Sequence, residues 1–319
     1  ILGEVSRLCL SYAPNQTGPK TVIAKFQSPA EENISLCQTM GYYVREVNFY
    51  EQGRKSFPVR APNCYFSEIE AEGIPFALLI EEIPEITVMD QIIGADVDKT
   101  ASVFSVLAKL HAYYWESDEL YDLEWLPPMN NAMYKESQPL AANLFEAFKT
   151  TWAPVIDAEA LAAVKKFIPR YPEFLDWAVE QGNQTFTHND ARCENYLFSP
   201  DGSVTMVDFQ YCTRFWGAWD ISNWLSASLD IEDRRNHAEE LVCHYHNELI
   251  ANGVQGYSIE QCWFDLKASL MVQTYNQVID NDLDYSNARG SQLLEKCILR
   301  TFSAASDYEI ASFIKGVGF

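Results

Sequence analysis

The chain has 319 residues, of which 48% are hydrophobic and 21% charged, and 45 acidic residues against 23 lysines and arginines give a formal net charge of −22. This composition is typical of a globular protein with a sizeable core and excludes a disordered or fibrous chain. The acidic excess argues against a nucleic-acid partner, because phosphate backbones are recognised by clustered basic side chains. No apolar run reaches the roughly 18 residues of a membrane span, so we expect no membrane partner either.

Eight cysteines occur without a CxxC pair or the close spacing of a disulfide framework. Their pattern favours reduced thiols and a cytoplasmic protein, and we attribute the Asn-x-Ser/Thr sequons at Asn15, Asn33 and Asn183 to chance. Residue 1 is Ile and a strand pattern follows at once, so we expect the natural chain to begin upstream. The sequence leaves the oligomeric state open.

The first 85 residues alternate short β-type runs with turn signals. Residues 5–12 and 21–26 predict two strands, and residues 63–69 and 75–80 predict two more. Between them, apolar residues spaced three or four apart predict a single helix over residues 31–52. The pattern indicates a small sheet with one inserted helix.

After residue 96 the chain is predominantly helical. The first helix is expected over residues 98–115, with Asp98 or Thr100 as its cap. A β-hairpin interrupts this region, with strands at residues 196–198 and 204–207 around a Ser-Pro-Asp-Gly turn. Further helices are expected at 219–229, 234–250, 259–279 and 291–314.

The most specific motif surrounds that hairpin. The residues HNDARCEN begin at His188 and place Asp190 and Asn195 five residues apart, and Asp208 follows the hairpin in MVDF. Phosphoryl transfer needs a carboxylate to receive the proton of the attacking hydroxyl and oxygen ligands for Mg²⁺, and kinases space these groups as H-x-D-x-x-x-x-N followed by D-F. Turn-forming polar residues are the ordinary alternative, but chance matches at this spacing are rare, so we favour a kinase-type site.

Two upstream residues extend the kinase pattern. Lys25 lies in VIAKF, on the second predicted strand, and Glu46 lies on the following helix. Kinases pair a strand lysine, which contacts the nucleotide phosphates, with a glutamate on the next helix. An ordinary surface pair is the alternative, and the order of the two residues favours the functional interpretation.

These motifs together resemble a known family. The catalytic-loop residues, VDFQ at 207–210, GAWD at 217–220, LAKLHA at 107–112 and REVNFY at 45–50 are similar to the aminoglycoside phosphotransferase and choline kinase-like small-molecule kinases. The branch that the chain resembles most is the ecdysteroid kinase-like one. The resemblance implies an α+β, two-lobed, protein-kinase-like fold, with a small antiparallel-sheet lobe carrying one helix over residues 1–83 and a larger helical lobe over residues 84–319.

The resemblance also implies roles for individual residues. They are Asp190 as catalytic base, His188 as the residue that orients the loop, Asn195 and Asp208 as Mg²⁺ ligands, Lys25 as the contact to the ATP phosphates, Glu46 as its partner, Asp220 as a brace for the loop, and residues 79–83, with Glu81 and Ile83, as an adenine-binding hinge. GTP is an alternative to ATP. The chain departs from the family at Asn189, where glycine is usual, and it has only Gly3 where a glycine-rich phosphate loop is expected.

A small hydroxylated molecule is the expected acceptor. Only 12 residues separate Asp208 from Asp220, which leaves little room for a peptide-binding segment, and Asn189 replaces the arginine that regulates protein kinases. A protein kinase and a catalytically silent binding protein remain the alternatives.

Two further patterns are given ordinary interpretations. Acidic runs at 230–233 and 280–284 near aromatic residues would suit a cationic amine acceptor, but we favour solvated acids and core aromatics. A zinc site at His244 and His246 is rejected, because residues two apart on a helix point in different directions.

Overall fold

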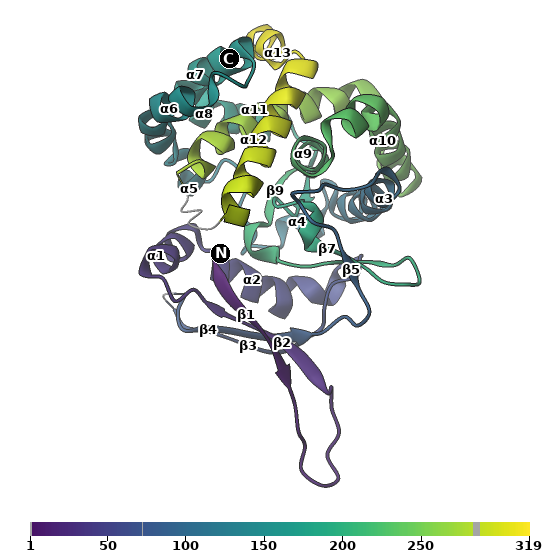
Figure 1. Ribbon diagram of the computed structural model, residues 1–319. Helices are drawn as coiled ribbons and strands as arrows, with labels where there is room; N and C mark the ends of the chain where they lie inside the picture. Colours follow the sequence, from purple (N-terminus) through teal and green to yellow (C-terminus); the bar gives the residue numbers. More distant parts are fainter. Residues whose placement is uncertain (1, 72, 283–287) are drawn as a thin grey trace. The chain divides into compact units, whose positions relative to one another are not determined.

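The computed structural model describes residues 2–71, 73–282 and 288–319, and it divides the chain into two compact units, each with its own buried core (Figure 1). The first unit comprises Ile1–Thr87, Leu123–Leu126 and Asn195–Cys212. The second comprises Val88–Asp122, Pro127–Glu194 and Thr213–Phe319.

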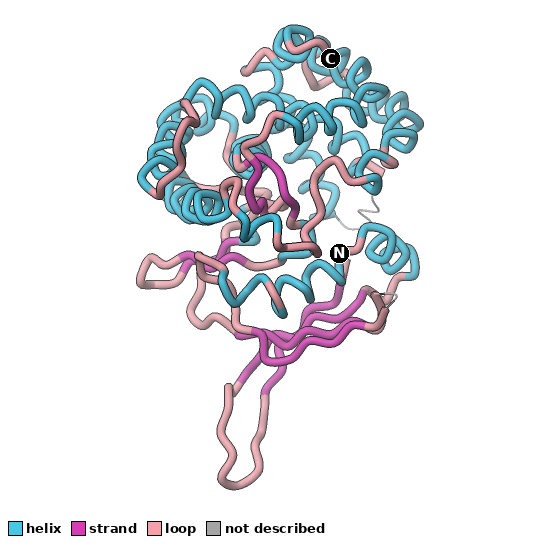
Figure 2. The backbone as a smooth tube through the Cα atoms, turned by 180° about the vertical axis from the view of Figure 1, so that it is seen from behind, coloured by secondary structure: helices cyan, strands magenta, loops and turns pink. Residues whose placement is uncertain are grey.

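The first unit is built on a four-stranded antiparallel sheet in the order β1-β2-β4-β3. Its strands are β1 (Gly3–Cys9), β2 (Thr21–Gln27), β3 (Cys64–Ile69) and β4 (Phe76–Glu81). The four predicted strands are therefore confirmed to within a few residues. Lys25 lies in the middle of the sheet, opposite Val5 of β1 and Leu78 of β4. Figure 2 shows β1 and β2 continuing into a long loop beyond the sheet.

Two helices, not one, follow β2. They are α1 (Glu31–Met40) and α2 (Tyr42–Glu51), and a short 3₁₀ turn, η1 (Gly53–Ser56), comes after them. The predicted single helix is wrong because Gly41 adopts a left-handed conformation with φ 65°, and its N–H closes α1 on the carbonyls of Cys37 and Gln38. Helical spacing continues across this break and hides it in the sequence. In Figure 1, α2 lies along one face of the sheet.

The predicted hairpin is confirmed and belongs to the first unit. Its strands are β7 (Tyr196–Phe198) and β8 (Val204–Met206), flanked by the 3₁₀ turns η3 (Cys193–Asn195) and η4 (Phe209–Tyr211). The ring of Phe209 stacks on that of Phe49 in α2, with centroids 3.5 Å apart, and meets Phe57 edge-on at 5.4 Å. This aromatic cluster fixes the segment after the hairpin to α2.

The described part of the second unit is helical apart from a short antiparallel pair of strands, β6 (Gln184–Thr187) and β9 (Thr213–Trp216). The short strand β5 (Thr87–Val88) stands where the chain passes from the first unit to the second. The helices are α3 (Val97–Tyr114), α4 (Asp118–Tyr121), α5 (Ala132–Lys135), α6 (Gln138–Trp152), α7 (Ala158–Phe167), η2 (Ile168–Arg170), α8 (Tyr171–Glu180), α9 (Ala218–Asn223), η5 (Trp224–Ser228), α10 (Ile231–Ala251), α11 (Ile259–Asp280), α12 (Ala288–Asp307) and α13 (Ile310–Gly316). Helix α10 packs on α3, and α11 packs on both α9 and α12.

Several helix boundaries differ from the sequence prediction. Helix α3 begins at Val97 because Asp96, not Asp98 or Thr100, caps it by accepting the N–H of Lys99 at 2.7 Å. The expected helix over 219–229 is α9 followed by the π-helical turn η5. The expected helix over 291–314 is two helices, since Glu309 has φ 54° and separates α12 from α13.

Four large aromatic residues lie in the core of the second unit. The side chains of Trp216, Trp219, Trp224 and Tyr275 are at most 1% exposed, which confirms their interpretation as core residues. Of the acidic run at 280–284, residues 283–284 lie outside the described residues. Within the described ranges, no helix has both the length and the apolar character needed to cross a membrane.

Candidate active site

Three predicted residues of the first unit form a cluster of charged side chains. The Lys25 Nζ atom lies 2.6 Å from Oε1 of Glu46 on α2 and 3.0 Å from Oδ1 of Asp208, just after β8. The Glu46 side chain is 1% exposed, that of Lys25 15% and that of Asp208 22%, so the cluster opens to solvent on the Asp208 side. The predicted Lys25–Glu46 pair is thus present, and Asp208 joins it across 183 residues of chain.

The charges in this cluster are unequal. Burial alone would lower the pKa of Lys25, but the carboxylates of Asp208 and Glu46 outweigh it, so the pKa is raised and the ammonium stays charged. Burial also raises the pKa of Glu46, against the attraction of Lys25. One ammonium therefore stands between two carboxyl groups, and the half-open Asp208 end retains negative charge for a further cation.

Local backbone structure holds Asp208 in place. Asp208 has φ 69° and ψ 68°, a left-handed conformation that few residues other than glycine adopt and that is frequent at functional sites. The aromatic cluster around Phe209 anchors the next residue. The buried guanidinium of Arg45 donates from Nη1 to the carbonyl of Gln210 at 3.1 Å. Sequence reasoning did not predict these supporting roles of Arg45 and Phe209, although the two residues lie in the motifs REVNFY and VDFQ.

The hairpin brings Asn195 to the same end as Asp208. Val207 donates its N–H to the carbonyl of Asn195 at 3.1 Å, so the residue before β7 lies beside the residues after β8. The Asn195 residue is 4% exposed. Amide and carboxylate oxygens are the donors that Mg²⁺ prefers, and this pair therefore has chemistry suited to the metal.

The expected hinge residues lie at the end of β4. Glu81 donates its N–H to the carbonyl of Asn63, and its carboxylate pairs with Arg60 at 3.0 Å and accepts from the side chain of Asn63 at 2.9 Å. Ile83 is 6% exposed. The Glu81 side chain is thus engaged within the first unit.

In the second unit, a buried carboxylate braces the predicted catalytic loop. The Asp220 side chain is fully buried and accepts the backbone N–H groups of His188 at 2.7 Å and Asn189 at 2.9 Å. It also lies 3.2 Å from Nε2 of His111. The predicted bracing of the loop by Asp220 is confirmed, and the loop that leads to Asp190 is held by hydrogen bonds to its backbone.

Asn189 keeps the conformation that a glycine would allow. Its φ is 62°, in the left-handed region that asparagine tolerates better than most residues. Although asparagine replaces the usual glycine at this position, the loop keeps the positive φ angle that a glycine would allow.

Two arginines, Arg192 and Arg289, link Asp190 to Glu194 and Asp90 through a series of ion pairs. Sequence reasoning did not predict these ion pairs. Arg192 Nε lies 3.4 Å from Oδ2 of Asp190, and its Nη1 lies 3.3 Å from Glu194. Arg289, at the start of α12, lies 2.8 Å from Glu194 and 2.9 Å from Asp90. The position of Arg192 two residues after Asp190 was the available signal.

The end of α11 adds a half-buried acidic group, Asp280, close enough to Asp190 to interact with it electrostatically. Burial, together with the negative charge of Asp190, raises the pKa of Asp280 to about 7. This shift sets Asp280 apart from the solvated acids that sequence analysis expected in the run at 280–284.

The eight predicted site residues divide between the two units. The first unit holds Lys25, Glu46, Glu81, Ile83, Asn195 and Asp208, and the second holds His188 and Asp190. His244 and His246 take part in other contacts, with Ser105 at 2.8 Å and the carbonyl of Tyr257 at 2.9 Å. No group of three or more histidine, cysteine, aspartate or glutamate residues in the described ranges could hold a metal ion.

A sheet with a central Lys–Glu pair, joined to a helical unit that carries a braced HxD loop, defines a kinase-like fold related to the small-molecule phosphotransferases. Solved structures share it: a candidate aminoglycoside phosphotransferase from Ralstonia eutropha JMP134 has a TM-score of 0.55 at 14% identity, covering 97% of this chain and 92% of that one. For an ethanolamine kinase from Plasmodium vivax the TM-score is 0.53 at 13% identity, with 89% and 77% covered. For APH(2″)-IIIa, solved with GDP and kanamycin, it is 0.53 at 12% identity, with 98% and 94% covered.

The family follows from the sequence itself. The model of the ecdysteroid kinase-like family matches residues 2–254, and the chain belongs to this family. No curated protein matches the sequence. The identities to the solved structures are low, and those structures therefore establish the fold alone.

Proposed function

We propose that this protein transfers the γ-phosphoryl group of ATP, or of GTP, to a hydroxyl group of a small molecule. The observation that carries the proposal is the contact of Lys25 with both Glu46 and Asp208, at 2.6 and 3.0 Å. The two carboxylates that the kinase pattern predicts at separate places in the sequence both contact the Lys25 ammonium. In kinases the corresponding lysine, paired with a glutamate, binds the nucleotide phosphates.

Each residue has a role in the proposed reaction. Asp190 accepts the proton as the hydroxyl oxygen attacks the γ-phosphorus, the bond to the β,γ-bridging oxygen breaks, and the nucleoside diphosphate leaves. Lys25 binds the phosphates and Glu46 fixes its orientation. His188 orients the loop, and the backbone at Glu81 and Ile83 receives the adenine.

A divalent metal is part of the proposal. Asn195 and Asp208 would hold Mg²⁺, because both offer oxygen donors and Asp208 keeps negative charge beside a single ammonium. The bound ion would neutralise charge that develops on the phosphate oxygens.

A titration of Mg²⁺ with ATP and with GTP tests the nucleotide site. A nucleotide at 100 times its dissociation constant should stabilise the wild type by about 2.7 kcal/mol, a rise of a few degrees in Tm. Asp208→Asn should abolish this rise. Asp201→Asn, an exposed aspartate in the turn of the same hairpin, is the matched control and should leave it intact.

A transfer assay tests the chemistry. With γ-labelled nucleotide and a panel of hydroxylated small molecules, we expect label transfer that Asp190→Asn reduces by about 10²–10⁴-fold without loss of nucleotide binding. Label on a generic protein substrate alone would support a protein kinase instead. Nucleotide binding with no transfer to any acceptor would support a silent binding protein, and absence of binding would contradict the proposal.

A further inference from the structure

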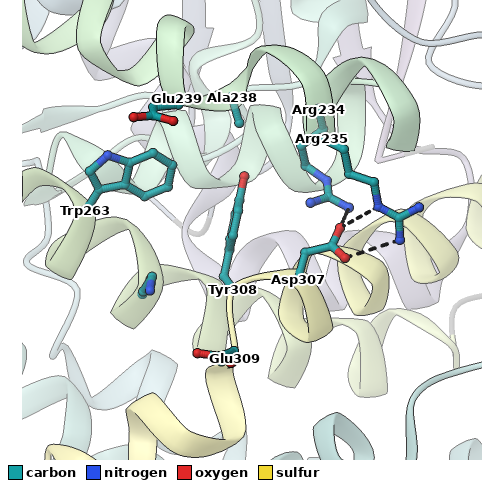
Figure 3. Close-up of a pocket in the computed structure, with 9 residues that line it drawn as sticks. Arg234, Arg235, Ala238, Glu239, Trp263, Asp307, Tyr308 and Glu309 are labelled. Carbon is teal, nitrogen blue, oxygen red and sulfur yellow. Dashed lines mark hydrogen bonds and ion pairs between the residues drawn. The ribbon is translucent and has the colours of Figure 1, made fainter.

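A pocket lies in the helical unit and shares no residue with the proposed active site. Its volume is about 630 Å³, within the range of pockets that hold small molecules. Its walls come from α10, α11 and the junction of α12 with α13 (Figure 3). The lining residues are Arg234, Arg235, Ala238, Glu239, Trp263, Lys267, Asp307, Tyr308 and Glu309.

A buried arginine with unused donors lines this pocket. Arg234 is 1% exposed, and its Nη2 donates to Ser303 at 2.9 Å and to Asp307 at 2.7 Å. Its Nε and Nη1 atoms have no hydrogen-bond partner among the described residues. Buried guanidinium donors without a partner are costly, so such groups normally mark the place of a water or a bound anion.

Arg234 shares the carboxylate of Asp307 with Arg235. Arg235 binds Asp307 at 3.0 Å from Nε and 3.2 Å from Nη2 (Figure 3), and it also pairs with Glu232 at 3.0 Å. Burial would raise the pKa of Asp307, but the hydrogen bonds from Arg235 and Arg234 outweigh it and hold that pKa below its usual range. Lys267 adds a third cation, and it forms no ion pair within the described ranges. The acidic residues Glu239 and Glu309 are exposed.

Two aromatic rings provide the apolar part of the pocket. The rings of Trp263 and Tyr308 meet edge-on with centroids 5.6 Å apart, and the Arg234 guanidinium lies 5.5 Å from the Tyr308 ring. Figure 3 shows Tyr308 standing between Trp263 on one side and Arg234 on the other. Its buried hydroxyl has no hydrogen-bond partner within 3.5 Å in the described part of the chain.

We propose that this pocket binds a small organic anion, an aromatic carboxylate or phosphate monoester, whose acidic group pairs with Arg234 and Lys267 and whose ring packs on Trp263 and Tyr308. Local cations are needed for this in a chain of net charge −22, which as a whole repels anions. The combination of a few fixed charges with aromatic walls is that of small-molecule sites in general. The site is separate from the proposed phosphotransferase reaction and stands whether or not that reaction occurs.

Calorimetric titration of the full chain with benzoate, phenyl phosphate and inorganic phosphate, at constant ionic strength, tests the proposal. We expect benzoate or phenyl phosphate to bind at one site and more tightly than inorganic phosphate, because only these two can also use the aromatic walls. Whichever of the two binds more tightly identifies the acidic group. Saturating Mg²⁺ and nucleotide should leave the affinity unchanged, since none of the proposed nucleotide-binding residues lines the pocket.

Variants locate the binding. Lys267→Met and Trp263→Leu should each weaken it about tenfold, the effect of losing one charge-assisted contact or one aromatic wall. Lys166→Met removes the same charge from an exposed lysine outside the pocket and should leave the affinity unchanged. Melting curves of the variants verify that they fold. The proposal is overturned if neither organic anion binds at millimolar concentration, or if folded Lys267→Met and Trp263→Leu proteins bind as tightly as the wild type.

Discussion

The two units hold their predicted site residues by different physical means. In the first unit, Lys25 lies between Glu46 and Asp208, and one ammonium cannot neutralise two carboxylates. In the second, the Asp220 carboxylate accepts hydrogen bonds from backbone N–H groups, those of His188 and Asn189. The first arrangement leaves charge available to a ligand, whereas the second uses its charge to fix the course of the chain. The first should therefore respond to ligands, and the second should determine stability.

Removal of the Asp220 carboxylate is the strongest test of this contrast. Asp220→Ala leaves two backbone amides and the His111 ring without their acceptor in a fully buried place, at about 1–3 kcal/mol for each group. We expect a loss of about 3–5 kcal/mol in the free energy of unfolding, measured by urea denaturation. Asp122→Ala, which removes an exposed aspartate of the same unit, should change it by less than about 0.5 kcal/mol. Equal stability of the two variants would show that Asp220 does not brace the loop.

Removal of the ammonium tests the first unit. Lys25→Met leaves the buried Glu46 carboxylate and Asp208 facing each other, and we expect a loss of about 3 kcal/mol. Glu46→Gln should restore part of this loss in the double variant, because it removes the unpaired buried charge. A double-mutant cycle by urea denaturation measures the coupling. Strictly additive losses would contradict a direct interaction between the two side chains.

A third buried carboxylate has neither an ammonium nor a backbone amide among its hydrogen-bond partners in the structure. Asp265 is fully buried and accepts hydrogen bonds from the Tyr257 hydroxyl at 2.9 Å, from the Gln261 amide at 2.7 Å and from the side chain of Asn183, and burial raises its pKa to about 7. The folded state favours the protonated form of Asp265. The contribution of Asp265 to the free energy of unfolding is therefore fully present below about pH 4, and it is lost as the pH rises to about 7.

Asp265→Asn should remove this dependence. Relative to the wild type, the variant should gain about 4 kcal/mol at pH 8 and nothing at pH 4, as measured by urea midpoints at both values. The pH-dependent difference isolates Asp265, because the other carboxyl groups are common to both proteins. A difference that is constant with pH would show that Asp265 titrates normally in the folded protein.

Local patterns made the strands and the ligand-type residues predictable. Alternating apolar residues gave the four strands of the sheet, and the spacing of His188, Asp190, Asn195 and Asp208 identified the kinase pattern before any fold was known. Such signals lie within about 20 residues of one another. The pairing of Lys25 with Glu46 could be predicted too, because it follows a strand–helix order.

Contacts between distant segments were not predictable in the same way. Arg45 binds a carbonyl 165 residues away, and Asp280 acquires its shifted pKa from burial that no local pattern reveals. The helix breaks at Gly41 and Glu309 were missed because apolar periodicity continues across both. Each break occurs at one residue with a positive φ angle, and the spacing of hydrophobic residues carries no information about φ.

Gly41 provides the smallest and most local of these tests. It has φ 65°, and an added Cβ would meet no atom within 4 Å, so backbone strain is the main cost of a side chain there. We expect Gly41→Ala to lose about 1 kcal/mol by urea denaturation, and Gly41→Asn to lose less, since asparagine tolerates the left-handed region. Gly316→Ala is the matched control: that glycine ends α13, has equally open surroundings and lacks a positive φ, so the change should be neutral or slightly stabilising. If Gly41→Ala were as harmless as Gly316→Ala, the break between α1 and α2, and with it the placement of the helix that carries Glu46, would not depend on this backbone angle.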